Sequence, residues 1–134
     1  MIVADTNLVA YLLIEGDRTE AARRVWARDP AWHVPPLWRS EYLSVLTVSV
    51  RALVLERDAA LLAWNRAVGL LGDYEVEPTG EDVLATAVDL GVSAYDAHFV
   101  CVARELRAPL VTSDRRLIEA CPRVAVSPEA FMAA

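Results

Sequence analysis

The sequence predicts an α/β fold, in which a central, mainly parallel sheet carries helices on both of its faces. Short apolar runs alternate along the chain with longer segments whose apolar residues recur at helical spacing. Parallel strands require such helical crossovers between them. The 134 residues fit one domain, so residues 1–134 are expected to share one core. Hydrophobic residues make up 55% of the chain, which excludes a disordered protein.

The first elements are a strand and two helices. Residues 2–4 are all apolar and predict a short buried strand. The polar residues 5–7 can cap a following helix over residues 8–14, which Gly16 ends. Asp17 is then expected to cap a second helix, over residues 19–28.

The middle of the chain predicts two long helices between weaker strands. Residues 32–34 are a candidate strand, which Pro35 and Pro36 end. Helices are expected over residues 37–54 and 58–71 from their apolar periodicity. Residues 74–76 are a further, weaker strand candidate.

The last part of the chain alternates helices and strands more closely. Gly91 ends a helix over residues 81–90, and Ser93 caps the next helix, which runs to residue 106. The remaining elements are a strand at 109–112, a helix at 115–120, a strand at 124–126 and a terminal helical turn opened by Ser127 and Pro128.

Charge and composition exclude several classes of function. The formal net charge is −6, so the chain does not coat nucleic acid through bulk positive charge. All thirteen basic residues are arginine. The absence of lysine excludes a Schiff-base mechanism and a phosphate-binding lysine.

The cellular compartment is expected to be the cytoplasm. Cys101 and Cys121 are the only cysteines and form no metal-binding or redox pair motif, which favours a reduced protein. No basic stretch follows Met1, so no signal peptide is expected. The longest early apolar run, residues 8–14, is too short to span a membrane, and no membrane association is expected.

Four carboxylates are predicted at positions where α/β proteins usually bind ligands. Asp5 and Asp114 follow strands, and ligands bind at the carboxyl ends of parallel strands. Glu41 projects from an apolar helix stripe, and Asp96 lies in the first turn of its helix, towards its inner side. Simpler roles remain open: Asp5 and Asp114 as helix caps, Asp96 as a helix N-terminal charge, and Glu41 in a buried ion pair with an arginine.

Such a set of carboxylates predicts a site for hard divalent cations. Mg²⁺ and Mn²⁺ prefer oxygen ligands and can activate water and clamp a phosphodiester. They also offset the repulsion between the acids and a phosphate, which allows an acidic protein to cut nucleic acid. Zinc is disfavoured because no cysteine and histidine spacing supports it.

The ordered set of these motifs resembles one known family. Its residues are Val3-Ala4-Asp5-Thr6-Asn7, Glu41 after a Pro-Pro turn, Ser93-Ala94-Tyr95-Asp96-Ala97, and Leu110-Val111-Thr112-Ser113-Asp114. Their order and spacing are similar to those of the PIN-domain family over nearly the whole chain, and in particular to the VapC-type toxins of toxin–antitoxin pairs.

The resemblance implies a fold, an activity and partners. It implies a three-layer α/β/α domain and a Mg²⁺- or Mn²⁺-dependent endoribonuclease. The toxin is expected to form a homodimer and to be blocked by a cognate antitoxin. It implies metal-binding and catalytic roles for Asp5, Glu41, Asp96 and Asp114, supported by the polar residues Thr6, Asn7, Thr112 and Ser113. Some relatives carry one more acid where this chain has Arg116, which puts a second tightly held metal in doubt.

Several alternatives stay open at this point. Arg115 and Arg116 either contact RNA phosphates or lie on a solvated helix face. His98 is expected on the polar side of its helix rather than at the site. The same fold could serve as a non-catalytic module that binds RNA or protein, or as a DNA nuclease. Phosphoryl-transfer domains with strand-end aspartates are disfavoured because they use a lysine.

Overall fold

The computed structural model describes residues 1–134 and contains four short strands and eight α-helices. The strands are β1 (Ile2–Ala4), β2 (Trp32–His33), β3 (Leu110–Val111) and β4 (Ala125–Val126). The helices are α1 (Thr6–Leu13), α2 (Thr19–Arg28), α3 (Trp38–Arg51), α4 (Arg57–Leu71), α5 (Gly80–Leu90), α6 (Ala94–Leu106), α7 (Arg115–Ala120) and α8 (Pro128–Ala133), with a 3₁₀ turn η1 (Gly72–Tyr74) after α4.

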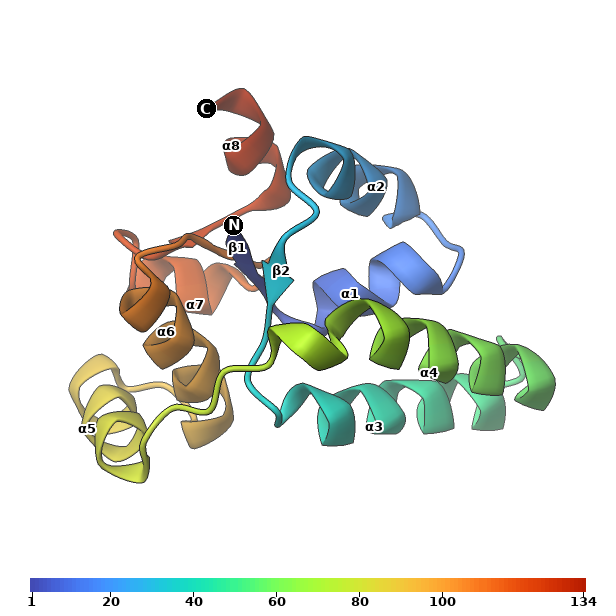
Figure 1. Ribbon diagram of the computed structural model, residues 1–134, viewed down its shortest axis with the longest axis horizontal. Coiled ribbons are helices and arrows are strands. Elements are labelled where there is room, and N and C mark those ends of the chain that lie inside the picture. The colour runs from blue at the N-terminus through green and yellow to red at the C-terminus, as the bar shows by residue number, and fades with distance from the viewer.

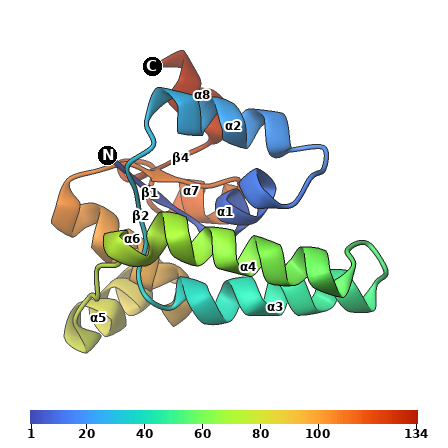
Figure 2. The ribbon, with the colours of Figure 1, turned by 45° about the vertical axis from the view of Figure 1, so that its right-hand side comes forward.

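All strand pairs of the sheet are parallel. The strand order is β2-β1-β3-β4, so β1 lies at the centre beside β3 although the two strands are more than 100 residues apart. The pair α5 and α6 lies on one side of the sheet, and α1 and α2 lie on the other with the long α3–α4 hairpin (Figures 1 and 2). The predicted three-layer α/β/α architecture is therefore confirmed, and the carboxyl ends of all strands meet at one edge.

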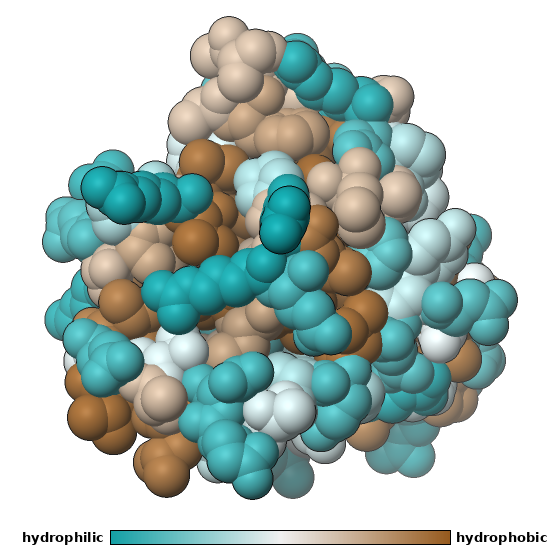
Figure 3. All heavy atoms as spheres, turned by 60° about the vertical axis from the view of Figure 1, so that its left-hand side comes forward, coloured by the Kyte–Doolittle hydropathy of each residue, from teal (hydrophilic) through white to brown (hydrophobic).

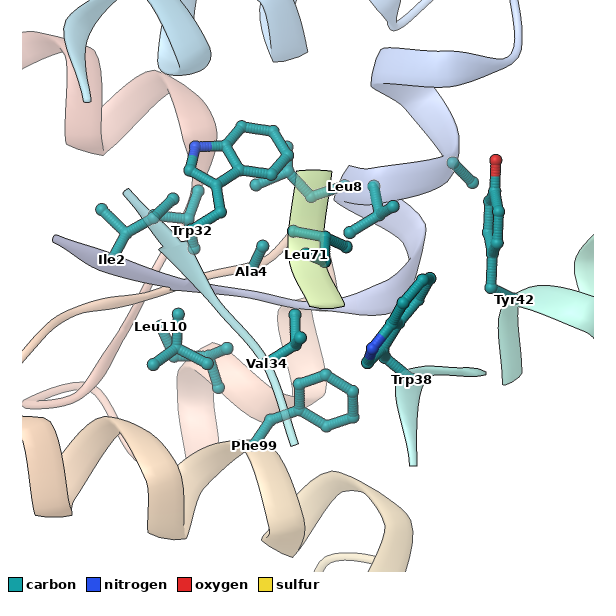
Figure 4. Close-up of a cluster of buried hydrophobic side chains, with 14 of the residues drawn as sticks. Ile2, Ala4, Leu8, Trp32, Val34, Trp38, Tyr42, Leu71, Phe99 and Leu110 are labelled. Atoms are coloured by element: carbon teal, nitrogen blue, oxygen red, sulfur yellow. The ribbon is translucent and has the colours of Figure 1, made fainter. Parts of the chain in front are cut away.

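The core lies between the sheet and the helices that cover it. The β1 residues are fully buried, and the large side chains around them come from β2, α3 and α6 (Figure 4). Trp32 and Trp38 are almost completely buried, and Trp38 stacks on Trp64 of α4 at 5.9 Å between ring centroids. These tryptophans stabilise the packing of the hairpin against the sheet and are not free to stack on bases.

The start of α2 differs from the prediction. Asp17 does not cap the helix, whose first turn has no side-chain cap at Arg18. The hydroxyl of Thr19 instead accepts from the backbone N–H of Gly16 and donates to the carbonyl of Ile14. The Thr19 hydroxyl thus bridges the two ends of the turn between α1 and α2, and Asp17 lies in this turn, outside the helix.

The strand predicted at residues 74–76 is wrong in most of its length. A 3₁₀ turn ends at Tyr74, and only one isolated parallel bridge forms, between Val34 and Glu75. Pro35 follows Val34 and has no N–H to continue the ladder. The Glu75 carboxylate turns to Arg39 of α3, with two N···O distances of 2.7 and 3.1 Å.

Helix α3 ends three residues earlier than predicted. Its last residue is Arg51, and Leu53 takes a left-handed backbone conformation with φ of 60°. The carbonyl of Ser49 then accepts from the N–H groups of Val54 and Leu55. The turn between α3 and α4 therefore requires a conformation that usually favours glycine.

The surface carries scattered apolar side chains as well as charges. Leu84 and Val88 of α5 are exposed, and the face towards which α5, α6 and α7 lie is a mosaic of hydrophilic and hydrophobic residues (Figure 3). No helix of this structure combines the length and the apolar character needed to cross a lipid bilayer.

Candidate active site at the carboxyl edge of the sheet

The four candidate carboxylates line one cavity of about 300 Å³. Asp5 follows β1 directly, Asp114 follows β3, and Glu41 and Asp96 come from the first turns of α3 and α6. Only three of the eleven lining residues are hydrophobic, and none is an arginine or a histidine. The full lining is Asp5, Thr6, Asn7, Glu41, Ser44, Val45, Asp96, Phe99, Thr112, Asp114 and Leu117.

Asp5 is held on both of its carboxylate oxygens. Oδ1 accepts from the N–H of Leu8 at 2.7 Å, which caps α1, and Oδ2 accepts from the Thr112 hydroxyl at 2.5 Å. Burial raises the pKa of Asp5 from 3.8 to about 6, and the charges of Asp114 and Asp96 add to this rise. The helix cap considered from the sequence is therefore real and coexists with a place in the cavity.

Glu41 lies half-buried opposite the end of β1. Its Oε1 accepts from the hydroxyl of Thr6 at 2.7 Å. Burial raises its pKa, and the charge of Asp96 adds to the rise, whereas the bond from Thr6 and the charge of His98 oppose it. No arginine forms an ion pair with Glu41, so the alternative of a buried ion pair is not what the structure shows.

Asp96 and Asp114 face the same cavity from α6 and α7. Burial raises the pKa of Asp96, and the nearby charge of Asp114 raises it further. Asp114 caps α7, because its Oδ1 accepts from the N–H groups of Arg116 and Leu117 at 3.0 and 3.3 Å. These bonds use one oxygen of the carboxylate, and Oδ2 has no hydrogen-bond partner within the protein.

The chemistry of the lining fits a hard divalent cation. Several oxygen donors meet without a positive side chain among them, and burial and mutual repulsion raise the pKa values of three of the four acids. No three histidine, cysteine, aspartate or glutamate side chains are gathered tightly enough to hold an ion directly. Because Mg²⁺ usually keeps several water ligands, the residues present suit an ion bound partly through water.

The other predicted residues divide into two groups. Thr6 and Thr112 donate to Glu41 and Asp5, and Asn7 also lines the cavity. Ser113 does not line it. Arg115 and Arg116 are exposed, form no ion pair and lie outside the lining.

His98 does not line the cavity, as its place in the helical pattern predicts. Its positive form lowers the pKa of Glu41, although its Nδ1 is bound to the carbonyl of Ala94 at 2.6 Å. The side chain is half-buried and does not line the cavity. It therefore influences the charge of the site without being part of it.

Five further residues of the site region escape the sequence-based prediction: Phe99 and Leu117, which line the cavity, and the three that follow. Ser44 and Val45 line the cavity and stand three and four residues after Glu41, so helical spacing could have found them. Arg18 donates to the Ser113 hydroxyl at 2.8 Å across 95 residues of sequence. No local sequence pattern predicts a contact between residues so far apart in the chain.

Comparison with known proteins gives a consistent result. A model of the PIN domain family matches residues 2–121. Ribonuclease VapC3 of Pyrobaculum aerophilum is 28% identical over 124 residues, which are 90% of this chain and 95% of that protein.

Solved structures also resemble this fold. A crystal structure from Pyrobaculum aerophilum superimposes with a TM-score of 0.75 at 20% identity, covering 98% of this chain and 93% of that one. A toxin–antitoxin complex from Klebsiella pneumoniae gives 0.68 at 16% identity, covering 96% and 98%. FitAcB from Neisseria gonorrhoeae gives 0.70 at 15% identity, covering 96% and 99%.

Proposed function

The chain belongs to the PIN-domain family, and from this premise we propose that it is a metal-dependent endoribonuclease, the toxin of a toxin–antitoxin pair. The observation that carries the proposal is the cavity at the sheet edge. Four carboxylates from four separate elements line it, and no arginine or histidine does. The similarity of the chain to a protein named as a ribonuclease supports RNA as the substrate.

Asp5, Glu41, Asp96 and Asp114 would hold Mg²⁺ or Mn²⁺ in this proposal. Such an ion, when bound, lowers the pKa of water and polarises the scissile phosphodiester. The protein's own part is to keep the acids ionised and oriented. Thr112 and Thr6 do so by donating to Asp5 and Glu41, and each of these bonds favours the charged carboxylate.

The partners follow from the same family membership. We propose a cognate antitoxin, supported by the likeness to a toxin–antitoxin complex, and a homodimer in the cytoplasm. The α3–α4 hairpin leaves an exposed apolar surface, which is typical of a protein interface. Its exposed residues are Leu43, Val48, Leu53, Val54, Leu61 and Leu62. Light scattering of the purified protein should give about twice 14.7 kDa.

A non-catalytic binding module on the same fold is the alternative. A module without catalysis has no need to gather acids that raise the pKa of their neighbours, as Asp114 does for Asp5 and Asp96. The intact and mutually repelling acids therefore favour the enzyme. The two functions differ in whether a divalent ion is required for a covalent change in RNA.

Cleavage of RNA and matched DNA by purified protein tests the proposal. The protein, folded and free of antitoxin, is incubated with structured RNA, tRNA included, and with Mg²⁺, Mn²⁺ or EDTA. We expect cleavage of RNA with either ion, none with EDTA, and none by Asp96→Asn. The control is Asp58→Asn, because Asp58 also lies in the first turn of a helix but is exposed and outside the cavity. Intact RNA under all conditions would favour the binding module.

A further inference from the structure

A second hollow adjoins the carboxylate cavity, and we propose that it binds the RNA nucleotide next to the cleaved bond, with Arg18 on its phosphate and Tyr11 against its base. The inference rests on the proposed nuclease function and assigns the substrate contacts of that site. It concerns the turn between α1 and α2, which carries none of the four acids.

The two hollows form a continuous groove. The second has a volume of about 260 Å³ and shares Asn7 and Val45 with the carboxylate cavity. Its lining continues along α1 to Tyr11 and then to Arg18 and Thr19. It also includes two exposed carboxylates, of which Glu15 is paired with Arg23 and Asp17 is not in an ion pair. A strand of RNA whose scissile phosphate lies among the four acids would pass Tyr11 and Arg18.

Arg18 is an ordered cation at the edge of an acidic site. Its Nη2 donates to the Ser113 hydroxyl at 2.8 Å, and its guanidinium lies 5.3 Å from the centre of the Tyr11 ring. The nearest carboxylate partner is Glu129, at 4.0 Å, on an exposed side chain. Such a surface pair is weak, so the remaining guanidinium donors are available to a phosphate.

The position of Ser113 ties Arg18 to the reacting centre. Ser113 directly precedes Asp114 in the chain, so the guanidinium is hydrogen-bonded to the residue next to a carboxylate of the cavity. Arg115 and Arg116 also neighbour Asp114, but they make no ion pair and line neither hollow. A cation that is already ordered loses less conformational freedom when it binds a phosphate.

The lining of the second hollow suits a single nucleotide. Tyr11 is half-buried and carries the Arg18 guanidinium over one face of its ring, so a base would contact the rest of the ring. Ala10, Ile14 and Val45 supply apolar surface. Aromatic stacking is the usual way in which proteins hold unpaired bases. The volume lies below the roughly 300–1,000 Å³ of ordinary ligand pockets. This favours one base with its phosphate over a segment of folded protein.

Binding and cleavage measurements on Arg18→Gln test the role of the cation. We expect KM for a short single-stranded RNA to rise about tenfold with kcat nearly unchanged. The dependence of log Kd on log salt concentration should fall by about 0.7, the value for one lost phosphate contact on a single strand. Arg18→Lys should keep the salt dependence. Arg24→Gln is the control, since Arg24 is exposed on α2 and pairs with Glu20, and neither residue lines either hollow.

Substitution of Tyr11 tests the base contact separately. Tyr11→Phe should bind RNA as the wild type does, and Tyr11→Leu should weaken binding about tenfold at every salt concentration. Binding is followed by fluorescence anisotropy of labelled RNA in EDTA, in an Asp96→Asn background, so that it is independent of cleavage. Thermal unfolding confirms that each variant is folded.

The outcomes separate this inference from the proposed function. If the wild type cleaves RNA but folded Arg18→Gln keeps its KM, its Kd and its salt dependence, the subsite is wrong and the nuclease stands. An Arg18→Gln variant that loses only binding to a protein partner also contradicts the subsite. If the wild type does not cleave RNA under any condition, the proposed function itself fails.

Discussion

Thr112 joins the two aspartates that follow the central strands. Its hydroxyl donates to Asp5 and accepts from the backbone N–H of Asp114 at 3.0 Å, and its side chain is completely buried. One hydroxyl thus fixes the end of β1 relative to the end of β3. A residue without a charge therefore sets the distance between two acids.

Replacement of Thr112 by valine keeps the shape and removes both bonds. We expect Thr112→Val to lower the free energy of unfolding by about 1–3 kcal/mol, because a buried carboxylate and an N–H lose their partner. Thr112→Ser should restore most of that loss. Urea unfolding of the three proteins measures the difference, and a Thr112→Val protein as stable as the wild type would show that the hydroxyl is not needed.

The raised pKa of Asp5 predicts an unusual pH dependence of stability. The folded protein holds this proton up to about pH 6, whereas the unfolded chain releases it near pH 3.8. Between these values the folded state binds more protons, so stability falls as the pH rises. A shift of about 2 units corresponds to about 3 kcal/mol.

Comparison with Asp5→Asn isolates this contribution. In EDTA, the stability of Asp5→Asn relative to the wild type should rise by about 3 kcal/mol between roughly pH 4 and pH 7. Denaturant unfolding at several pH values gives the difference directly. The lowered pKa values of Asp29 and Glu75 make stability rise with pH, but this contribution is the same in both proteins and cancels in the comparison. A pH-independent difference would contradict the raised pKa.

At the scale of single elements, the helix ends show where local sequence decides and where it does not. Gly91 ends α5 in a left-handed conformation with φ of 66°, as its position after an apolar stretch predicts. Leu53 adopts the same region after α3, with its side chain 92% exposed. A leucine gives no sign of such a conformation, so the apolar pattern predicts an end of α3 three residues beyond the true one.

The left-handed residues after α3 and α5 predict opposite changes in stability when glycine is introduced at the first and removed from the second. Leu53→Gly should raise the free energy of unfolding by about 0.5–1 kcal/mol, because it relieves the left-handed strain and removes no buried side chain. Gly91→Ala should lower it by about 1 kcal/mol, although a new Cβ would meet no atom within 4 Å. Thermal unfolding of both variants checks the pair. A destabilised Leu53→Gly would mean that this side chain is covered in solution.

At the scale of the whole molecule, the order of the strands in the sheet brings the acids of the site together. Because β1 lies beside β3, residues 5 and 114 meet although most of the chain separates them. The parallel strands and their terminal aspartates could be predicted from the sequence, since both depend on short local patterns. The groove past Tyr11 and the bond from Arg18 to Ser113 could not, because they depend on how α1 and α2 pack.

An ion bound among the acids should stabilise the whole fold. In the proposed function, Mg²⁺ or Mn²⁺ relieves the repulsion between Asp5, Asp96 and Asp114. At a hundred times the dissociation constant, binding adds about 2.7 kcal/mol to the free energy of unfolding. Thermal unfolding with and without Mn²⁺ measures it. A variant with all four acids changed to amides should show no such rise, and an equal rise in that variant would place the ion elsewhere.

The most direct test of the central claim is the rate of RNA cleavage by four single variants under single-turnover conditions with Mn²⁺. The variants are Asp5→Asn, Glu41→Gln, Asp96→Asn and Asp114→Asn, each confirmed as folded and compared with Asp58→Asn. We predict that each of the four lowers the rate at least about a hundredfold, while Asp58→Asn cleaves as the wild type does. Full activity in any one of the four would remove that residue from the site, and full activity in all of them would contradict the carboxylate centre.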